Sequence, residues 1–179
     1  FLALAITTCF APLLRAFAAT NWQSFDGYRT APLSVPSDGN SGFASLAPTA
    51  TGITFTNWLN ENRSITNQVF LNGSGVAAGD VDGDGLCDLY FCGLDSPNAL
   101  YRNLGNWKFE DIAKASGVDC ADQASTGATL ADLDGDGDLD LLVNGMMRGT
   151  RLFLNDGNAK FQEITEASGL KNNRGSTSF

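Results

Sequence analysis

The sequence predicts an all-β protein that forms part of a β-propeller, and three observations support this fold class. Residues 74–118 and 126–170 are two copies of one unit, 52 residues apart, with 19 of 45 aligned positions identical. A fixed period of about 50 residues is typical of propeller blades and solenoids. Each copy holds four short apolar stretches bounded by Gly, Asn or Asp, and four strands make one propeller blade. The 20 Gly residues favour turns and short strands over long helices.

The chain begins with a predicted signal peptide at residues 1–18, interpreted as clipped because no Met or basic region precedes it. Its apolar run ends in Ala16-Phe17-Ala18, a small-x-small cleavage pattern. A buried or membrane helix is the alternative, but a span needs about 20 apolar residues and this run is shorter. We therefore expect export, without membrane insertion after cleavage. Residues 19–42 are rich in Ser, Pro, Gly and Asn, which predicts a linker or irregular arm.

The two units are predicted to contain four strands each. The expected strands lie at residues 75–79, 88–92, 99–102 and 107–112 in the first unit, and at 127–131, 140–144, 151–154 and 159–164 in the second. Asn and Gly between the third and fourth strands favour hairpin turns, because both accept positive φ. Residues 119–125 are expected to form the inter-blade loop.

Both ends of the repeat region are expected to belong to further blades. Gly42–Ile53 resembles the stretch from Lys108 to Val118, so residues 43–73 are predicted to be an N-terminal strand region that donates an outer strand. Residues 171–179 lie near the register where a third unit would begin, and we interpret them as the start of a truncated third blade. Because two blades cannot close a ring, the remaining propeller blades are expected in a longer full-length chain.

The negative charge is concentrated at two points. The chain has 11 Lys and Arg against 20 Asp and Glu, a net charge of −9, and nine of the acids are Asp in windows 80–88 and 132–140. The 11 acids elsewhere balance the 11 bases. A negative net charge without a basic patch argues against nucleic-acid partners. The chain has no His, which excludes Ser-His-Asp triads, HExxH zinc sites and zinc fingers.

Both windows fit the pattern D-x-D-G-D-G-x-x-D, which is typical of a calcium loop. Positions 1, 3 and 5 offer carboxylates, position 7 a backbone carbonyl and position 9 a closing carboxylate, while Gly at position 6 permits a sharp turn. The Glu that closes an EF-hand at position 12 is replaced by Phe91 and Val143. The expected ligands to two Ca²⁺ ions are Asp80, Asp82, Asp84, Leu86 and Asp88 in the first loop, and Asp132, Asp134, Asp136, Asp138 and Asp140 in the second. An ion-free turn is the alternative, and it would leave crowded carboxylates repelling one another.

The combined pattern resembles a known repeat family. The motif G-x-A-x-x-D-x-D-G-D-G-x-x-D-L, followed by a hairpin with N-x-G-x-x-F, is similar to the FG-GAP (VCBS-type) repeat of integrin-α-like β-propellers. The A-S-G-V/L endings make it most similar to bacterial secreted members related to the ASPIC/UnbV family. The resemblance covers residues 51–179 and implies that each loop joins the first two strands of a blade and binds calcium structurally.

The cysteines allow one disulfide hypothesis. In an exported chain, Cys92 and Cys120 are a candidate pair that would link a strand end to the inter-blade loop. Cys87, beside the first Asp window, is interpreted as a buried small hydrophobic residue. A catalytic thiol is not expected, because the chain has no His to act as its base.

These observations predict a non-catalytic, calcium-binding β-propeller segment of an exported protein. Its expected role is adhesion or protein–protein interaction with an unidentified protein or glycan partner, in the periplasm, outside the cell or on its surface. The alternative is a scaffold or carbohydrate-binding module of a larger secreted polysaccharide-active enzyme or lectin. A glycosidase needs two carboxylates facing each other across about 5 to 10 Å, whereas most acids here lie in the metal loops. The chain is therefore not expected to be an enzyme.

Overall fold

A computed structural model describes residues 22–32 and 42–170 of the chain. The chain divides into two compact units, residues 1–44 and 45–179, which are described separately below. The predicted signal peptide at 1–18 and the predicted third-blade start at 171–179 lie outside the described residues. Within the described ranges, no helix has the length and apolar character required to cross a membrane.

The first unit contains a short hairpin where the sequence predicted an irregular arm. Strand β1 (Gln23–Phe25) pairs antiparallel with β2 (Tyr28–Thr30). The two strands meet at an Asp-Gly turn in which Gly27 has a φ of 78°, a combination that favours tight hairpins. The rings of Phe25 and Tyr28 stack across the pair with centroids 5.1 Å apart. Local turn chemistry and one aromatic pair account for this hairpin, since both of its strands are exposed.

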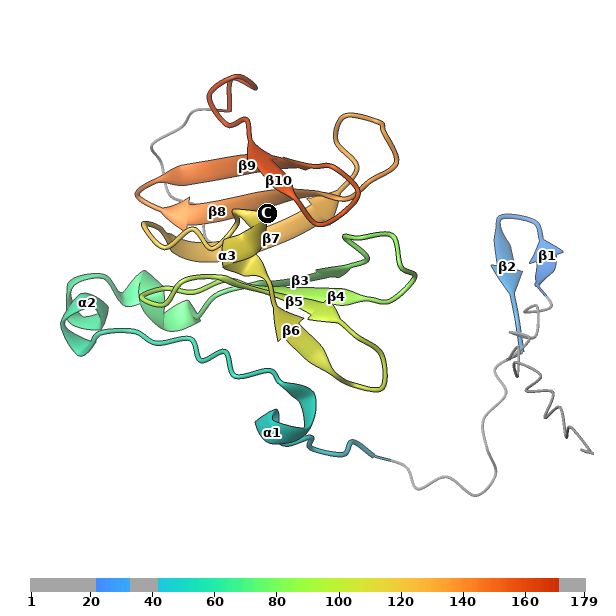
Figure 1. Ribbon diagram of the computed structural model, residues 1–179, viewed down its shortest axis with the longest axis horizontal. Coiled ribbons are helices and arrows are strands. Elements are labelled where there is room, and N and C mark those ends of the chain that lie inside the picture. The colour runs from blue at the N-terminus through green and yellow to red at the C-terminus, as the bar shows by residue number, and fades with distance from the viewer. Residues whose placement is uncertain (1–21, 33–41, 171–179) are drawn as a thin grey trace, which may run out of the picture. The chain divides into compact units, whose positions relative to one another are not determined.

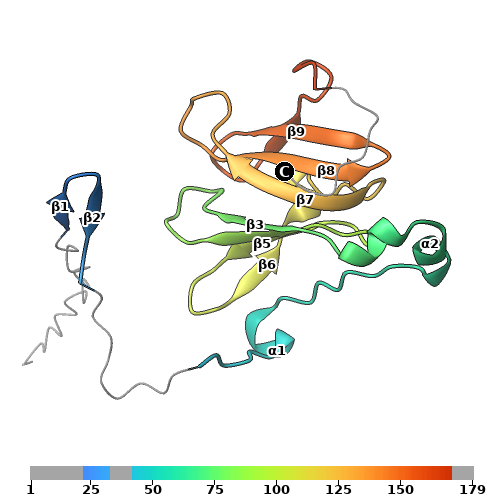
Figure 2. The same ribbon diagram turned by 180° about the vertical axis from the view of Figure 1, so that it is seen from behind.

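The second unit contains two four-stranded antiparallel sheets (Figures 1 and 2). The first sheet has the order β3 (Val76–Gly79), β4 (Asp88–Phe91), β5 (Ala99–Asn103), β6 (Phe109–Asp111). The second sheet has the order β7 (Ala124–Ala131), β8 (Asp140–Met146), β9 (Gly149–Asn155), β10 (Phe161–Glu163). With the hairpin, the described residues form three antiparallel sheets and only short helices, so the all-β prediction is confirmed.

The two larger sheets are stacked, with β3 and β7 against each other. Gly75 and Gly127, which occupy the same position in the two repeats, meet at this contact. A Cβ added to Gly75 would lie 2.9 Å from the Cα of Gly127, closer than side-chain carbons approach. Gly at this position therefore permits the first strands of the two sheets to come together.

The main core lies between the sheets. It consists of buried side chains from both repeats and their connection, among them Val81, Tyr90, Leu100, Val118, Leu141, Val143 and Phe153. Tyr90 is fully buried, and its hydroxyl donates to the Val118 carbonyl at 2.7 Å while accepting from Asn98 Nδ2 at 2.7 Å. The strand connections are therefore tied to the core by hydrogen bonds as well as by packing.

Residues 43–73 differ from the expected strand region. Their described part contains helix α1 (Pro48–Thr51), helix α2 (Glu61–Thr66) and the 3₁₀ helix η1 (Gln68–Asn72), and no strand. Asn60 caps α2 and Asn67 caps η1, each by accepting a backbone N–H two residues ahead. Side-chain capping therefore favours helical turns here over extended strand.

The segment after α1 crosses the face of the first sheet that points away from the second. The Phe55 ring stacks on Phe91 with centroids 5.3 Å apart, and the Thr54 N–H donates to the Tyr101 hydroxyl at 3.0 Å. Both contacts are made to side chains of the sheet, Phe91 and Tyr101, and not to its backbone. The segment covers the sheet without adding a strand to its edge.

Candidate metal sites

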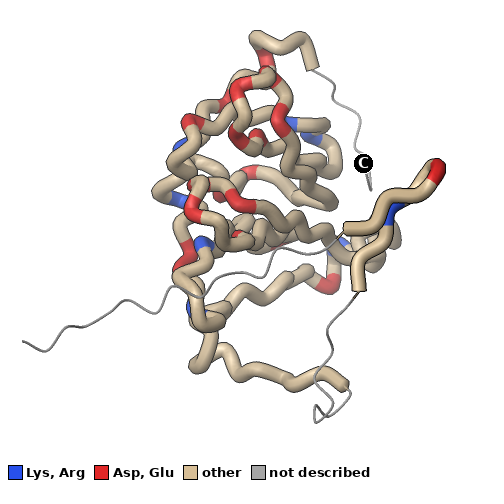
Figure 3. Tube along the Cα trace, turned by 90° about the vertical axis from the view of Figure 1, so that its right-hand side faces the viewer, with Lys and Arg blue, Asp and Glu red and all other residues tan. Residues whose placement is uncertain are grey.

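The two Asp windows form loops between the first and second strands of each sheet. The first Asp loop (residues 80–88) leads from β3 into β4, and the second Asp loop (132–140) leads from β7 into β8. Both loops lie at the same end of the stacked sheets, and acidic positions occur along both (Figures 1 and 3). The repeat therefore places two acidic loops side by side in equivalent positions.

The first residue of each loop organises the backbone around its carboxylate. Asp80 Oδ1 accepts the N–H of Gly83 at 2.8 Å, and Asp80 Oδ2 accepts the N–H of Gly85 at 2.8 Å. Asp132 accepts from its equivalent glycines at 2.7 and 3.2 Å. Gly83 and Gly85 have φ values of 74° and 83°, in the left-handed region that side-chain-bearing residues avoid. The D-x-D-G-D-G pattern thus determines the path of the loop.

Each loop brings three carboxylates together. One oxygen from each of Asp80, Asp82 and Asp88 lies within 4.8 Å of the others in the first loop. In the second loop the cluster is Asp132, Asp134 and Asp136, which shares loop positions 1 and 3 with the first but takes position 5 in place of position 9. All the donors are oxygens, the ligand type that Ca²⁺ and Mg²⁺ prefer, whereas Zn²⁺ prefers nitrogen and sulfur. The residues present therefore fit a hard divalent cation.

The remaining predicted ligands lie outside these clusters. They are Asp84 and Leu86 in the first loop, and Asp138 and Asp140 in the second. At position 7, the side chains lie beside the turn glycines of their own repeats: a Cβ added to Gly105 would lie 3.8 Å from Leu86 Cδ1, and one added to Gly157 would lie 2.4 Å from Asp138 Oδ2. Because these side chains point at the turn, only the backbone carbonyl at position 7 is a candidate ligand, which explains why the residue differs between the copies.

The closing aspartates have a structural role of their own. Asp88 and Asp140 are fully buried. Asp88 accepts the N–H of Val81 at 2.9 Å and of Asn103 at 2.7 Å, one on each oxygen. Asp140 does the same with Leu133 and Asn155, at 2.8 and 2.9 Å. Each closing carboxylate therefore joins the start of its loop to the end of the third strand.

Burial and mutual repulsion both oppose ionisation in the loops. Burial raises the pKa of Asp88, the N–H bonds from Val81 and Asn103 lower it, and the charges of Asp82 and Asp84 raise it further. Desolvation likewise raises the pKa of Asp138, followed by repulsion from the carboxylates around it. A bound cation would reverse the sign of this local field.

Asn103 and Asn155, expected from the sequence only to form hairpin turns, also make side-chain hydrogen bonds to the Asp loops. Asn103 Nδ2 donates to the Cys87 carbonyl at 3.0 Å. Asn155 Nδ2 donates to the carbonyls of Leu139 at 3.1 Å and of Val81, in the first loop, at 2.8 Å. Asn155 therefore connects the two Asp loops. The signal available in the sequence was the identity of this residue in both copies.

The three cysteines within residues 42–170, Cys87, Cys92 and Cys120, are free thiols. Cys92 and Cys120 are buried, and Cys120 Sγ lies 3.8 Å from the Tyr90 hydroxyl oxygen. Burial raises the pKa of Cys92 to about 12 and that of Cys120 to about 11. The Cys92–Cys120 disulfide stays a prediction, whereas Cys87 is exposed rather than buried as a small hydrophobic residue.

Comparisons with known proteins agree with this organisation. A family model described as an FG-GAP-like repeat matches residues 80–143 and 132–179. Cartilage acidic protein 1 is 33% identical over 98 residues in Xenopus tropicalis, 33% over 95 residues in Mus musculus and 31% over 98 residues in Homo sapiens. These alignments cover 51–53% of this chain but 15% of the length of each relative. Since these relatives are vertebrate proteins, the expected likeness to bacterial secreted members stays a prediction.

Proposed function

The chain belongs to the FG-GAP-like repeat family, and on that premise we propose that it is a non-catalytic, calcium-stabilised interaction module of an exported protein. Each Asp loop holds one Ca²⁺, and the ion stabilises the fold without taking part in chemistry. Two ions bring the net charge of −9 to −5. The module acts by presenting its loops and sheet ends to a partner.

The observation that carries this proposal is the repetition of the carboxylate cluster. Two loops of the same length, between equivalent strands, each hold three carboxylates within 4.8 Å. Three like charges at that separation repel strongly unless a cation or protons neutralise them. Ca²⁺ accepts six to eight oxygens in flexible geometry, whereas Mg²⁺ demands a near-ideal octahedron, so a flexible acidic loop favours Ca²⁺.

A repeated junction supports propeller-like stacking of further blades. Helix α3 (Ala113–Ser116) ends at Gly117 in the left-handed conformation, and α1 ends in the same way at Gly52. A Cβ added to Gly52 would approach the Phe109 carbonyl of the next sheet, and one added to Gly117 would approach that of Phe161. Gly169 has the same left-handed φ, and among the described residues a Cβ there would meet nothing within 4 Å. The repeat thus places a third turn of the same kind at Gly169.

The lysine directly before the fourth strand of each repeat strengthens the junction. Lys108 Nζ donates to the Ala50 carbonyl in α1, and Lys160 Nζ donates to the Ala115 carbonyl in α3 at 2.8 Å. Both bonds join one repeat to the helical turn before it. The contact therefore recurs with the repeat, as stacking of identical units requires.

The proposal is tested by thermal melting of the full chain in chelator, in calcium and in magnesium. Calcium at about 100 times its Kd adds about 2.7 kcal/mol per site. For a chain of this size that corresponds to an increase in Tm of roughly 5 to 10 °C. Magnesium at the same concentration should give a smaller increase.

Matched variants separate ion binding from general charge effects. Asp82→Asn and Asp134→Asn each remove one clustered carboxylate, and each should reduce the calcium-dependent increase in Tm. Glu110→Gln removes the same charge from an exposed ion pair with Arg102 and should leave the increase unchanged. A chain whose Tm is the same in chelator and in calcium would contradict the proposal.

A further inference from the structure

The second repeat holds the first Asp loop through Asn155. Asn155 Nδ2 donates to the Val81 carbonyl at 2.8 Å, and the N–H of Ala159 donates to the same carbonyl at 3.1 Å. Val81 lies between the clustered Asp80 and Asp82, and it is 1% exposed. The backbone that joins two candidate ligands of the first loop is therefore fixed by the other repeat.

A continuous path of hydrogen bonds joins the two carboxylate clusters. In the second loop, the N–H of Leu133, between two clustered aspartates, donates to Asp140 Oδ2 at 2.8 Å. Asp140 Oδ1 accepts the N–H of Asn155 at 2.9 Å, and the Asn155 amide reaches Val81. The N–H of Val81 donates to Oδ2 of Asp88, a member of the first cluster, at 2.9 Å. The Asn155 side chain thus carries the path from one repeat to the other.

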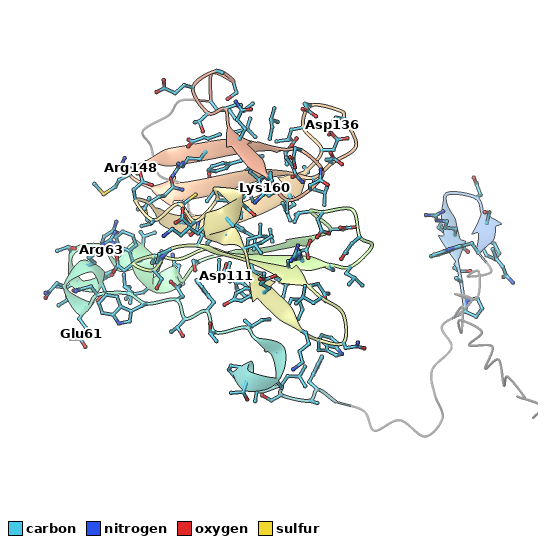
Figure 4. All side chains as sticks on the ribbon, in the orientation of Figure 1. Glu61, Arg63, Asp111, Asp136, Arg148 and Lys160 are labelled. Carbon is cyan, nitrogen blue, oxygen red and sulfur yellow. The ribbon has the colours of Figure 1, made fainter. Side chains whose placement is uncertain are left out.

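The central part of this path is shielded from water. Asp88 and Asp140 are fully buried, and Val81 and Asn155 are 1% and 6% exposed. These groups lie at the end of the stacked sheets that Asp136, in the second loop, marks in Figure 4. Hydrogen bonds in a low-dielectric interior are stronger than in water, and each polarises the next. A change in the position of one closing aspartate is therefore passed along the path.

The first repeat contains the same asparagine without the same contact. Asn103 occupies the position of Asn155, and its Nδ2 donates to the Cys87 carbonyl of its own loop. Leu133, which occupies the position of Val81, is 45% exposed. Within residues 42–170 the bond between the loops therefore occurs once, and Asn103 offers a matched comparison for it.

We propose that Asn155 is a positioning residue that couples the two candidate calcium sites, so that occupation of one loop strengthens binding in the other. The inference rests on the proposed function, because it assumes that both loops bind calcium. It adds that the loops do not act independently. By thermodynamic linkage, the strengthening is equal in the two directions.

The coupling follows from the repulsion within each cluster. Without an ion, the crowded carboxylates repel one another and oppose the N–H bonds that hold the loop. Neutralisation of the second cluster removes this repulsion and fixes Asp140. Through Asn155 it also fixes the Val81 peptide group of the first loop. The first loop then has less freedom to lose when it binds its own ion, which gives positive cooperativity.

The sign of the coupling separates it from a simple charge effect. Two cations in neighbouring loops repel each other, and the first ion also neutralises part of the negative charge that attracts the second. Charge alone therefore predicts that the second ion binds more weakly than the first. Stronger binding of the second ion requires a structural connection, and the Asn155 bond is such a connection.

The coupling is measured by calorimetric titration of the full chain with calcium. Asp82→Ala and Asp134→Ala each disable one loop and give the binding constant of the other loop alone. The coupling factor is the product of the two wild-type constants divided by the product of these single-loop constants. We expect a factor of about five or more, the lower end of couplings between linked sites.

A matched pair of variants assigns the coupling to Asn155. Asn155→Leu removes the side-chain amide but keeps the backbone N–H, and the Val81 carbonyl keeps its bond from Ala159. Asn103→Leu removes the equivalent amide, which bonds within its own repeat. The same titrations in each background should give independent sites for Asn155→Leu and an unchanged factor for Asn103→Leu.

Amide hydrogen exchange provides a second, structural readout. In Asp82→Ala only the second loop binds calcium, and the N–H of Val81 should exchange more slowly when calcium is added. This N–H bonds to Asp88, so slower exchange reports fewer openings of the first loop. Asn155→Leu in the same background should remove the effect.

The outcomes separate this inference from the proposed function. Two ions that bind independently, or a second ion that binds more weakly than the first, would overturn the inference alone. So would a coupling that persists in Asn155→Leu, or one that Asn103→Leu abolishes equally. A chain that binds no calcium and whose Tm ignores it would contradict the proposed function, and this inference with it.

Discussion

Replacing Asp140 by Asn should destabilise the protein even in the absence of calcium, whereas replacing Asp134 should not. Asp140 is fully buried and accepts one backbone N–H on each oxygen, from Leu133 and Asn155. Asn offers one acceptor, and its NH₂ group would face the other N–H. A hydrogen bond to a charged group contributes about 1.5–3 kcal/mol, and a buried N–H left unpaired costs about 1–3 kcal/mol. We therefore expect a loss of about 3 kcal/mol.

Asp134 provides the contrast, because it lies in the exposed part of the same loop. In chelator, Asp134→Asn removes one of three clustered charges, so the free energy of unfolding should change by less than about 0.5 kcal/mol. In calcium, the same variant should lose the stabilisation that the ion provides. The two aspartates thus separate the role of closing the loop from that of binding the ion.

The assay is urea unfolding of the wild type and both variants, followed by tryptophan fluorescence in chelator and in calcium. With a slope of about 2 kcal/mol per molar urea, Asp140→Asn should lower the unfolding midpoint in chelator by about 1.5 M. Equal midpoints for Asp140→Asn and Asp134→Asn in chelator would refute the reasoning, because the two N–H bonds would then contribute nothing measurable.

Two further predictions concern titratable groups outside the loops. The hydrogen bond from Arg151 lowers the pKa of Glu163 below its ordinary value of 4.5. The stabilisation from this pair is therefore fully present above about pH 4.5, and it is lost as the pH falls through the lower pKa of the folded state. Glu163→Gln should therefore lower the unfolding free energy at pH 7, by less than about 1 kcal/mol because the pair is partly exposed, and should match the wild type near pH 2 in the same urea assay. Burial raises the pKa of Cys92 to about 12 and of Cys120 to about 11, so iodoacetamide at pH 8 should modify the exposed Cys87 before Cys92 and Cys120 in the folded protein. Peptide mapping after labelling measures the order in which the cysteines are alkylated. A linked Cys92–Cys120 peptide would instead demonstrate the predicted disulfide.

The sheets and the loops could be predicted from the repeat, because identical residues at a fixed spacing indicate that the two copies share one local structure. Gly83 and Gly85 occur again at 135 and 137 because the loop needs left-handed backbone at those positions. Asp88 and Asp140 were recognised as closing residues from their spacing. Their burial and their two N–H bonds depend on the third strand, which lies 15 residues away, and spacing within the loop carries no signal for that contact.

The segment before the first repeat was harder to predict. Ile53-Thr54-Phe55-Thr56 alternates apolar and polar residues, a pattern that favours a strand. In the structure the alternation serves another purpose: Phe55 packs on the face of the first sheet and Thr54 bonds to a tyrosine hydroxyl there.

The hydrogen bonds of the loops determine what calcium adds. A carboxylate has about four acceptor sites. Asp80 uses three of them for the N–H groups of Gly83, Asp84 and Gly85, so its position is set by the backbone that surrounds it. Asp82 accepts one N–H, at 3.3 Å, and keeps more of its capacity for an ion. An ion bound there, as we propose, would meet carboxylates whose loop path is already held by N–H bonds, so calcium would raise stability by relieving their repulsion rather than by folding the loop.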